Sequence, residues 1–224
     1  MAQFKDRSAA GKRLAAALAQ YKDQPNTIVL GLPRGGAVVA YEIVKALGLP
    51  LDLLLVRKIG APFDRELAVG AIAYPDVCIV NNNFIKMFGI SQAVIDKIIA
   101  QEKLELIRRN HVYRRGCEPP LLLGKTVIIA DDGIATGANM QAAVKVVSMQ
   151  KPEKIVLAVP VAASDAIKKL EKEVDEIVCP IVLQNLGGIS NSYDDFTQVE
   201  DDEVLAILQQ VPQYGPNKAI INSL

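Results

Sequence analysis

The sequence "VIIADDGIATGANM" at residues 127–140 runs from four apolar residues into two adjacent carboxylates, Asp131 and Asp132, and then into a loop of small residues. Four consecutive apolar residues are typical of a strand that is buried on both faces. The residues from about 137 to 149 have the spacing of a helix. A buried strand followed by a short loop and a helix is the repeating unit of a parallel sheet. We therefore expect an α/β protein with an open parallel sheet.

The rest of the chain repeats this order on both sides of that stretch. The ranges with strand patterns are 26–32, 51–59, 125–131, 154–161 and 176–183, and those with helix patterns are 6–20, 35–48, 137–149, 164–173 and 201–211. This alternation predicts a sheet that is covered by helices on both faces. Residues 60–90 look like a flap or hairpin of two shorter strands around Pro75–Asp76. Residues 91–115 form a long amphipathic helix with Ser91 as the expected N-cap.

Composition excludes several classes of function. The 25 basic and 25 acidic residues balance, so there is no electrostatic case for nucleic-acid binding; the one local basic patch, residues 108–116, is a solvated helix end or a small functional patch. The longest apolar runs are shorter than the ~20 residues of a membrane span, and the opening residues show no secretion-signal pattern. Cys78, Cys117 and Cys179 lie far apart, which predicts single buried or half-buried thiols in a reducing, cytoplasmic setting.

The loop after the strand has the composition of an anion site. Residues 133–138, here called the phosphate loop, are small enough for successive backbone N–H groups to converge on a phosphate, and the next helix adds its N-terminal amides. Thr136 can add a hydroxyl donor. Asp131 and Asp132, the acid pair, would repel a phosphate but would accept hydrogen bonds from a ribose diol. An ordinary strand-to-helix turn with an Asp N-cap would explain one acid and one glycine, but not two acids.

These residues resemble the signature of the type I phosphoribosyltransferases, which is a hydrophobic strand, two acids and a small-residue loop with Thr-Gly. The order of elements agrees over roughly residues 25–185. "GLPRGG" at 31–36 and "VRKIGAP" at 56–62 resemble a bacterial subgroup of predicted phosphoribosyltransferases in particular. The resemblance implies a reaction type but not an acceptor.

The resemblance also implies a division of roles. The acid pair would hold the 2- and 3-hydroxyls of phosphoribosyl pyrophosphate (PRPP), and Asp131 and Asp132 would contact a metal directly or through PRPP and water. Arg34, Gly35 and Gly36 would belong to the pyrophosphate loop, residues 32–36, with a cis peptide expected at Pro33–Arg34. Taken alone, "LPRGG" is also compatible with a turn that opens a helix. The residues implied to cradle the 5-phosphate are Gly133, Ile134, Ala135, Thr136, Gly137 and Ala138.

Arg57 and Lys58 lie where the family has a basic segment that leads into a mobile flap. The resemblance implies that they reach the departing pyrophosphate, while residues 60–75 form a lid that excludes water. Arg57 and Lys58 could instead be ordinary charged residues at the end of a strand. The implied reaction is displacement of pyrophosphate at C1 of the ribose with Mg2+ as the cofactor, through an oxocarbenium-like transition state. His111, the only histidine, is expected at the surface.

We expect one domain over residues 1–224, with a flap and long-helix insert at about 60–120 and outer hood elements at about 1–24 and 184–224. The family recognises its acceptor with such a hood, so Tyr193 and Phe196 could stack on a flat base, although packing is the alternative. The long helix of the insert departs from compact nucleobase-salvage members, which puts a standard purine or pyrimidine acceptor in doubt. That helix could equally form a homodimer.

Three functions fit the sequence to different degrees. The preferred one is a Mg2+-dependent phosphoribosyltransferase acting on PRPP and a nitrogenous acceptor. A non-catalytic PRPP-binding regulator would keep the same loops, but neither a helix-turn-helix signature nor a basic face is present. A phosphatase with an Asp nucleophile would need a DxD-type spacing or further metal-binding acids, which the adjacent pair Asp131–Asp132 does not provide.

Overall fold

A central parallel sheet forms the middle layer of the molecule. The computed structural model describes residues 3–115 and 117–211, apart from the side chains of Arg65 and Glu66. Within this part the sheet has the order β2-β1-β6-β7-β9, and all its pairings are parallel. The expected open parallel α/β sheet is confirmed. Its strands are β1 (Thr27–Gly31), β2 (Leu51–Leu53), β6 (Thr126–Ala130), β7 (Lys154–Ala158) and β9 (Glu176–Val178).

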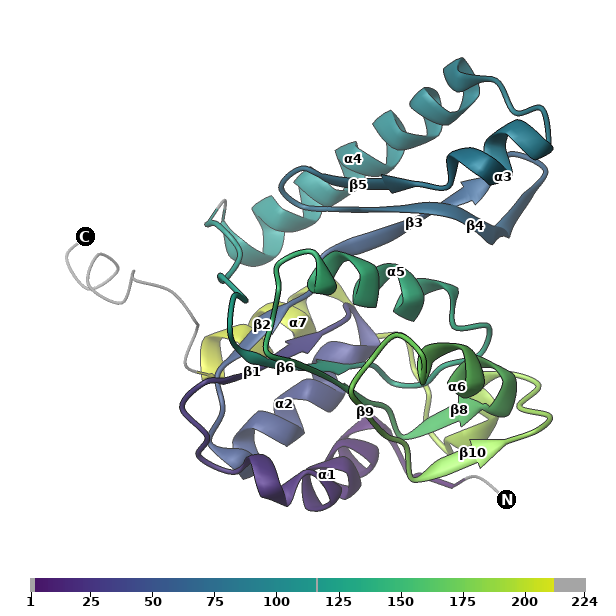
Figure 1. The fold of residues 1–224 in the computed structure, drawn as a ribbon. Helices are drawn as coiled ribbons and strands as arrows, with labels where there is room; N and C mark the ends of the chain where they lie inside the picture. Colours follow the sequence, from purple (N-terminus) through teal and green to yellow (C-terminus); the bar gives the residue numbers. More distant parts are fainter. Residues whose placement is uncertain (1–2, 116, 212–224) are drawn as a thin grey trace.

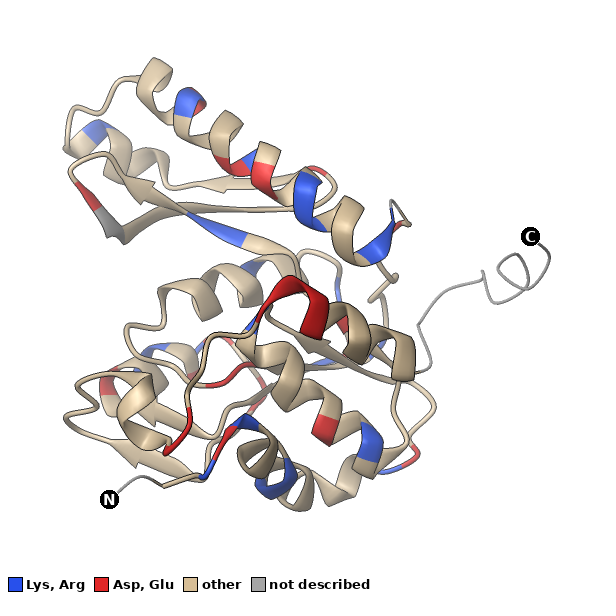
Figure 2. Ribbon diagram, turned by 180° about the vertical axis from the view of Figure 1, so that it is seen from behind, with Lys and Arg blue, Asp and Glu red and all other residues tan. Residues whose placement is uncertain are grey.

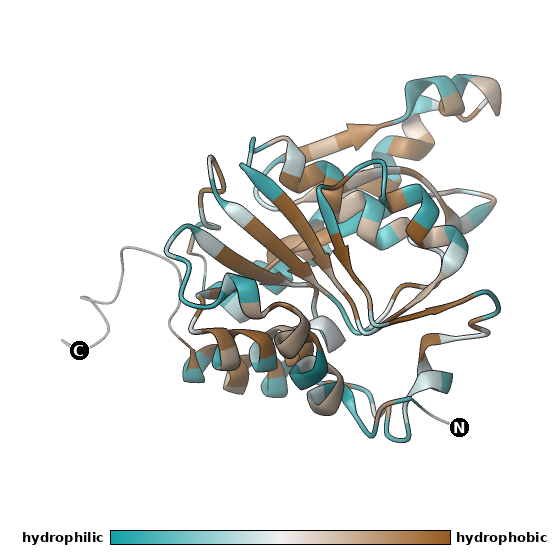
Figure 3. Cartoon of the chain, turned by 60° about the horizontal axis from the view of Figure 1, so that its bottom comes forward, coloured by the Kyte–Doolittle hydropathy of each residue, from teal (hydrophilic) through white to brown (hydrophobic). Residues whose placement is uncertain are grey.

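Helices cover both faces of this sheet because successive strand side chains point to opposite faces. In β1, Ile28 and Leu30 pack with α5 (Ala138–Ser148) and α6 (Ser164–Leu170). Val29 packs on the other face with α1 (Arg7–Ala17), α2 (Gly35–Leu47) and α7 (Asp201–Gln210). Figure 3 shows the apolar strands enclosed between the helical layers. The apolar runs of the sequence are therefore the two-sided core of the sheet.

An insert projects from this body as a separate arm (Figure 1). It consists of an antiparallel sheet in the order β3-β4-β5 and two helices, and α5 of the body contacts β3 and β4. The predicted hairpin is confirmed as β4 and β5, which flank the cis peptide Tyr74–Pro75. The elements of the insert are β3 (Val56–Ala61), β4 (Asp64–Ala73), β5 (Val77–Val80), α3 (Asn82–Met87) and α4 (Gln92–Arg114).

Three strands expected as single elements are each divided in the structure. The prediction of one strand over 51–59 is wrong because β1 ends at Gly31, which pairs with Leu53, so β2 has no partner further on. The chain then enters the insert sheet as β3. The strands expected at 154–161 and 176–183 break near Pro160 and Pro180, which cannot donate a ladder hydrogen bond. Their second halves, β8 (Val161–Ala163) and β10 (Ile181–Leu183), pair with each other in a small parallel sheet.

The N-terminal segment of the described chain pairs with a segment that precedes α7. The amides of Gln3 and Phe4 both donate to the Ser192 carbonyl oxygen, at 2.9 and 3.0 Å, and the Asp194 amide donates to the Phe4 carbonyl oxygen at 2.9 Å. Segment 3–7 therefore runs along segment 192–197, which follows the short 3-10 helix η2 (Ile189–Ser192). The second 3-10 helix, η1 (Ala19–Tyr21), follows α1. Among the described residues no helix is long and apolar enough to cross a membrane.

Candidate active site

The two loops singled out by the sequence lie side by side because their strands are neighbours. Gly31 at the end of β1 pairs with Ala130 at the end of β6, and the Leu32 amide donates to the Ala130 carbonyl oxygen at 2.9 Å. In parallel sheets, ligands bind outside the carboxyl ends of the strands. The pyrophosphate loop and the acid pair thus share the edge of the sheet where a ligand is expected.

The glycines of the pyrophosphate loop are required by close approach. A Cβ atom added to Gly35 would lie 1.9 Å from Oδ2 of Asp132, and one added to Gly36 would lie 2.8 Å from the Ala130 carbonyl oxygen. Both positions therefore exclude a side chain while the two loops keep this contact. The cis peptide expected at Pro33–Arg34 is confirmed.

The acid pair is held by three hydrogen bonds. The Asp132 amide donates to Oδ1 of Asp131 at 2.9 Å, and Arg7 Nε donates to Oδ2 of Asp132 at 2.7 Å. The Tyr193 hydroxyl donates to the Asp132 carbonyl oxygen at 2.6 Å. Asp132 is buried and Asp131 is half-buried. The Asp132 carboxylate is therefore placed against Arg7 of the N-terminal helix, and its backbone carbonyl is fixed by Tyr193 of the hood segment.

Burial also affects the protonation of the acid pair. Burial raises the pKa of Asp131 well above its ordinary value, and the neighbouring charge of Asp132 adds to the rise, while Arg7 acts in the opposite direction. Burial raises the pKa of Asp132 too, and the hydrogen bond and positive charge of Arg7 lower it. Both shifts favour the protonated acids, and a ligand that donates hydrogen bonds to the ionised acids would lower the two pKa values again.

The phosphate loop is open over its central residues but anchored at one position. Ala135 and Thr136 are exposed, whereas Ile134 is buried, and its amide donates to the Val161 carbonyl oxygen at 2.9 Å. Ile134 therefore anchors the loop through its backbone, and its N–H is not directed at a phosphate as expected. Gly137 has φ +82°, a left-handed conformation that favours glycine, and it directly precedes α5. The rest of the phosphate loop is continuous with the N-terminal amides of α5.

The two predicted arginines are paired with acids. Arg34 Nη1 lies 2.9 Å from Glu200 Oε2 and 3.9 Å from Asp201 Oδ1 at the start of α7, where acidic residues gather (Figure 2). Arg57 Nε donates to Glu102 of α4. Lys58 lies half-buried on β3 next to Arg57. The structure thus places Arg34 at the pyrophosphate loop and holds Arg57 within the insert.

The two hood aromatics occupy different environments. Tyr193 is only 6% exposed and packs against Phe4 and Phe196, at centroid distances of 5.5 and 5.0 Å. Phe196 is half-buried, and its ring carries the Arg7 guanidinium with Cζ 3.7 Å from the centroid. In this structure Tyr193 is a packing residue, which agrees with the alternative to base stacking. Arg7 is not predicted from the sequence, since no local pattern distinguishes it from the other basic residues of its helix.

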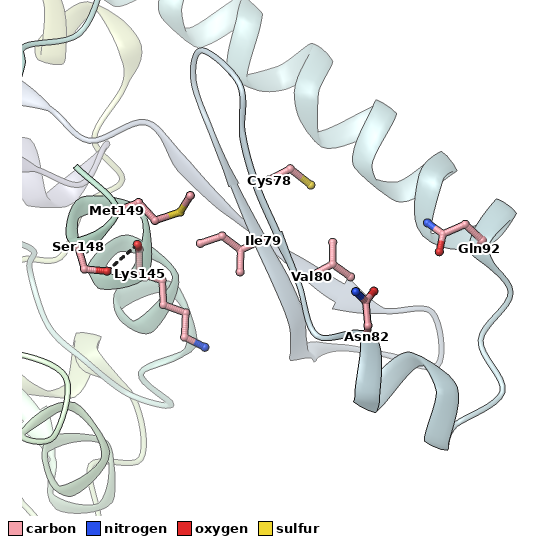
Figure 4. A pocket seen from close by; sticks show the side chains of 8 residues that line it. All are labelled: Cys78, Ile79, Val80, Asn82, Gln92, Lys145, Ser148 and Met149. Atoms are coloured by element: carbon pink, nitrogen blue, oxygen red, sulfur yellow. Dashed lines mark hydrogen bonds between the residues drawn. The ribbon is translucent and has the colours of Figure 1, made fainter. Parts of the chain in front are cut away.

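A cleft of about 690 Å³ lies away from the loops, between the insert and the C-terminal half of α5 (Figure 4). It is open and weakly polar, and it contains neither the acid pair nor the phosphate loop. Cys78 on its wall is exposed, as is Cys117, so the expectation that these thiols are buried or half-buried is wrong for both. The residues lining the cleft are Cys78, Ile79, Val80, Asn82, Gln92, Lys145, Ser148 and Met149.

Known proteins with similar sequences and structures identify the family of the chain. A family model described as a phosphoribosyl transferase domain matches residues 2–195. A Mycobacterium tuberculosis H37Rv protein named "Putative phosphoribosyl transferase Rv0571c" is 41% identical over 210 residues, which are 94% of this chain and 47% of that protein. The chain therefore spans about half the length of the curated relatives it matches.

Two solved structures extend the comparison. The crystal structure of TT1426 from Thermus thermophilus has a TM-score of 0.82 and 39% identity, and covers 92% of this chain and 97% of that one. The AQ2163 protein from Aquifex aeolicus has a TM-score of 0.52 at 15% identity over 86% and 87% of the two chains, which shows the fold alone. Because the family model spans most of the chain, including the two loops on the shared sheet edge, the chain belongs to the phosphoribosyl transferase family.

Proposed function

We propose that the chain is a Mg2+-dependent phosphoribosyltransferase that transfers the 5-phosphoribosyl group of PRPP to a nitrogenous acceptor and releases pyrophosphate. One observation carries this proposal. The acid pair and the phosphate loop follow β6 at the same sheet edge where Gly35 and Gly36 follow β1, with Gly35 in contact with Asp132. The segments that we propose to bind the diol, the phosphate and the pyrophosphate of PRPP are thus next to one another.

Each part of the site has a chemical task in this proposal. The acid pair accepts hydrogen bonds from the ribose hydroxyls, and the backbone of Gly133, Ala135, Thr136, Gly137 and Ala138 holds the 5-phosphate. The acceptor nitrogen attacks C1 while the bond from C1 to the pyrophosphate oxygen breaks, with inversion at C1. Positive charge develops on the sugar in such a reaction. The protein therefore acts by orienting the sugar and stabilising charge, without a covalent nucleophile.

The arginines would stabilise the leaving group. Arg34 stands on the pyrophosphate loop, and its guanidinium would exchange Glu200 and Asp201 for pyrophosphate oxygens, to which its planar fork is well matched. Arg57 and Lys58 of β3 would approach the pyrophosphate when the insert closes over the site, as residues 60–75 are proposed to do. Excluding water in this way protects the reactive sugar from hydrolysis.

The residues present fit Mg2+ as the cofactor. Among the described residues no group of three or more His, Cys, Asp or Glu side chains could hold a metal, so the acid pair stands alone. Mg2+ usually keeps several waters and binds through one or two carboxylates together with substrate phosphates. Asp131 and Asp132 would hold the ion directly or through water and the ribose hydroxyls. When bound, Mg2+ supplies positive charge that neutralises the pyrophosphate.

The acceptor and the assembly are also part of the proposal. We expect a small nitrogenous acceptor, with Phe196 and Tyr193 near its site, and a cytoplasmic homodimer that binds neither nucleic acid nor membranes. The homodimer is supported by exposed apolar residues on α4, where Leu104 is 69% exposed and Ile107 is 56% exposed. The three cysteines form no disulfide in the structure, which is compatible with a reducing compartment.

Calorimetry with PRPP and Mg2+, followed by a screen for pyrophosphate release over bases and small amines, tests this function. We expect PRPP to bind and one acceptor class to release pyrophosphate.

Asp132→Asn should lower turnover by at least about 100-fold, since a preorganised contact of this kind contributes about 3 kcal/mol in rate. His111→Gln, on the exposed surface of α4, should leave turnover unchanged. Binding without release for every acceptor would favour the PRPP-binding regulator, and equal losses in the two variants would refute the assignment.

A further inference from the structure

Arg7, which lies outside the predicted motifs, forms an ion pair with Asp132 of the acid pair. Its Nε donates to Oδ2 of Asp132 at 2.7 Å, and its Nη1 donates to the Thr197 carbonyl oxygen at 2.8 Å. The guanidinium also stacks on Phe196, with Cζ 3.7 Å from the ring centroid. The side chains of Arg7 and Asp132 are only 10% and 13% exposed. A guanidinium with two hydrogen bonds and a stacking partner has a fixed orientation.

The pairing of the N-terminal segment and the start of α1 place Arg7 beside Asp132. Segment 3–7 pairs with segment 192–197 through Phe4 and Tyr193, and the Asp195 amide donates to the Lys5 carbonyl oxygen at 2.8 Å. Asp6 then caps α1 by accepting from the Ala9 amide at 2.7 Å. Arg7 is consequently the first residue of the helix, where a cation opposes the helix dipole by roughly 0.3–1 kcal/mol. Helix stability therefore does not explain a cation here.

The pyrophosphate loop packs against the same ion pair. A Cβ atom on Gly35 would lie 1.9 Å from Asp132 Oδ2 and 2.8 Å from Arg7 Nε, so the absence of a side chain at position 35 makes room for the pair. Within residues 3–115 and 117–211, no other residue donates a hydrogen bond to the second carboxylate oxygen, Oδ1 of Asp132. With Oδ2 fixed by Arg7, that second oxygen has a defined direction at the sheet edge.

We propose that Arg7 is a positioning residue for the ribose site: it clamps one oxygen of Asp132 so that the carboxylate presents the other to a ribose hydroxyl. This inference rests on the proposed function. It assigns the N-terminal helix to the sugar end of the site, whereas the resemblance implied only an acceptor hood for this part of the chain. The opposite interpretation, that Arg7 competes with the sugar for Asp132, makes a different prediction about binding.

The first test measures PRPP affinity with Mg2+ by calorimetry on the full chain. Arg7→Gln should weaken binding at least tenfold. Arg7→Lys should recover part of the loss, because an ammonium can reach the carboxylate but cannot bond Asp132 and Thr197 together while stacking on Phe196. Arg13→Gln is the matched control, since Arg13 is an exposed arginine of the same helix with its Cζ 5.6 Å from the Phe4 centroid. It should stay within twofold of the parent protein.

The second test separates positioning from general structural support. Ribose 5-phosphate and 2,3-dideoxyribose 5-phosphate share the phosphate but differ in the hydroxyls. Arg7→Gln should weaken the first at least tenfold and leave the second within twofold. Equal weakening of both ligands would show a merely structural role, and tighter binding of ribose 5-phosphate would show competition; either result would overturn the inference.

Two further outcomes remain decisive. Should Arg7→Gln fail to fold by circular dichroism, Arg7→Lys and Phe196→Leu would replace it, and both should weaken ribose 5-phosphate more than the dideoxy compound. Unchanged selectivity in those variants would refute the role of Arg7. If the parent protein binds neither PRPP nor ribose 5-phosphate, the proposed function fails and the inference fails with it. If the parent protein and Arg7→Gln both bind PRPP and ribose 5-phosphate equally well, only the positioning role of Arg7 is refuted.

Discussion

At the scale of single residues, the site depends on a glycine that has no side chain. Gly35 has no Cβ, and this allows the pyrophosphate loop to touch the Arg7–Asp132 ion pair. We predict that Gly35→Ala lowers PRPP affinity at least about tenfold, because the new methyl group must displace the carboxylate that receives the sugar. Calorimetry would measure the affinity. Gly188→Ala is a suitable control, since a Cβ there would have no neighbour closer than 3.7 Å; an equal effect of both changes would contradict the prediction.

Thiol reactivity is a second property of single residues. Burial raises the pKa of Cys179 to about 11, whereas Cys78 and Cys117 are exposed. Because the thiolate is the reactive form, we expect iodoacetamide at pH 7.5 to modify Cys78 and Cys117 at least about tenfold faster than Cys179 in the folded protein. Mass spectrometry of peptides over time would give the three rates. In denaturant the rates should become similar, and a fast Cys179 in the folded protein would contradict the assigned burial.

At the scale of elements, the insert helix α4 is fastened to the body at its C-terminal end. Arg114 donates to Oδ1 of Asp52 on β2 at 2.9 Å, and the side chains are 8% and 12% exposed. The Tyr113 hydroxyl donates to Asp201 of α7 at 2.5 Å, and Arg108 reaches the same carboxylate at 3.2 Å. Since Asp201 also faces Arg34, the base of the insert is linked to the pyrophosphate loop through the start of α7.

We predict that Arg114→Ala lowers the free energy of unfolding by about 3–5 kcal/mol, because it leaves the Asp52 carboxylate buried without its partner. Urea denaturation would measure the change. Lys97→Ala, at an exposed position of the same helix, should change the stability by less than about 0.5 kcal/mol. A similar loss in both variants would show that the Asp52–Arg114 pair does not anchor the helix.

The same variant has a predicted pH dependence. Burial raises the pKa of Asp52, and the charge of Arg114 lowers it. Without Arg114 the folded-state pKa rises further above the unfolded value, so the folded protein takes up a proton more readily than the unfolded chain as the pH falls. The deficit of Arg114→Ala should therefore be largest above that raised pKa and should shrink as the pH falls towards the ordinary carboxyl value. A deficit that grows on acidification would contradict this reasoning.

At the scale of the whole molecule, the projecting insert exposes apolar side chains that a single chain does not cover. Leu104 and Ile107 of α4 are 69% and 56% exposed. We predict that the Leu104→Glu/Ile107→Glu double variant converts the proposed homodimer into a monomer, because burying two carboxylates in an apolar contact is unfavourable. Sedimentation velocity would measure the mass. Lys97→Glu, at an exposed position of the same helix, makes the net charge more negative by the same two units and is the matched control; a parent protein that sediments as a monomer would refute the dimer.

Much of the architecture could be predicted from the sequence because it depends on local patterns. Four apolar residues before Asp131 and the regular alternation of strands and helices required a parallel sheet covered on both faces. The two special loops follow strands, and a parallel sheet brings the carboxyl ends of its strands to one edge, so the shared position of these loops follows from the order of elements. The long helix at 91–115 followed from its own periodicity.

Only the tertiary structure decided where a strand ends its pairing and which distant side chains meet. β2 ends at Leu53 because β1 supplies no further partner, which depends on the length of a different strand. Arg7 meets Asp132 across 125 residues because segment 3–7 pairs with segment 192–197. The ion pairs of Arg34 and Arg57 likewise join distant segments. Patterns of neighbouring residues determine which elements form. Contacts between distant segments arise only when those elements pack, so local sequence patterns do not predict these contacts.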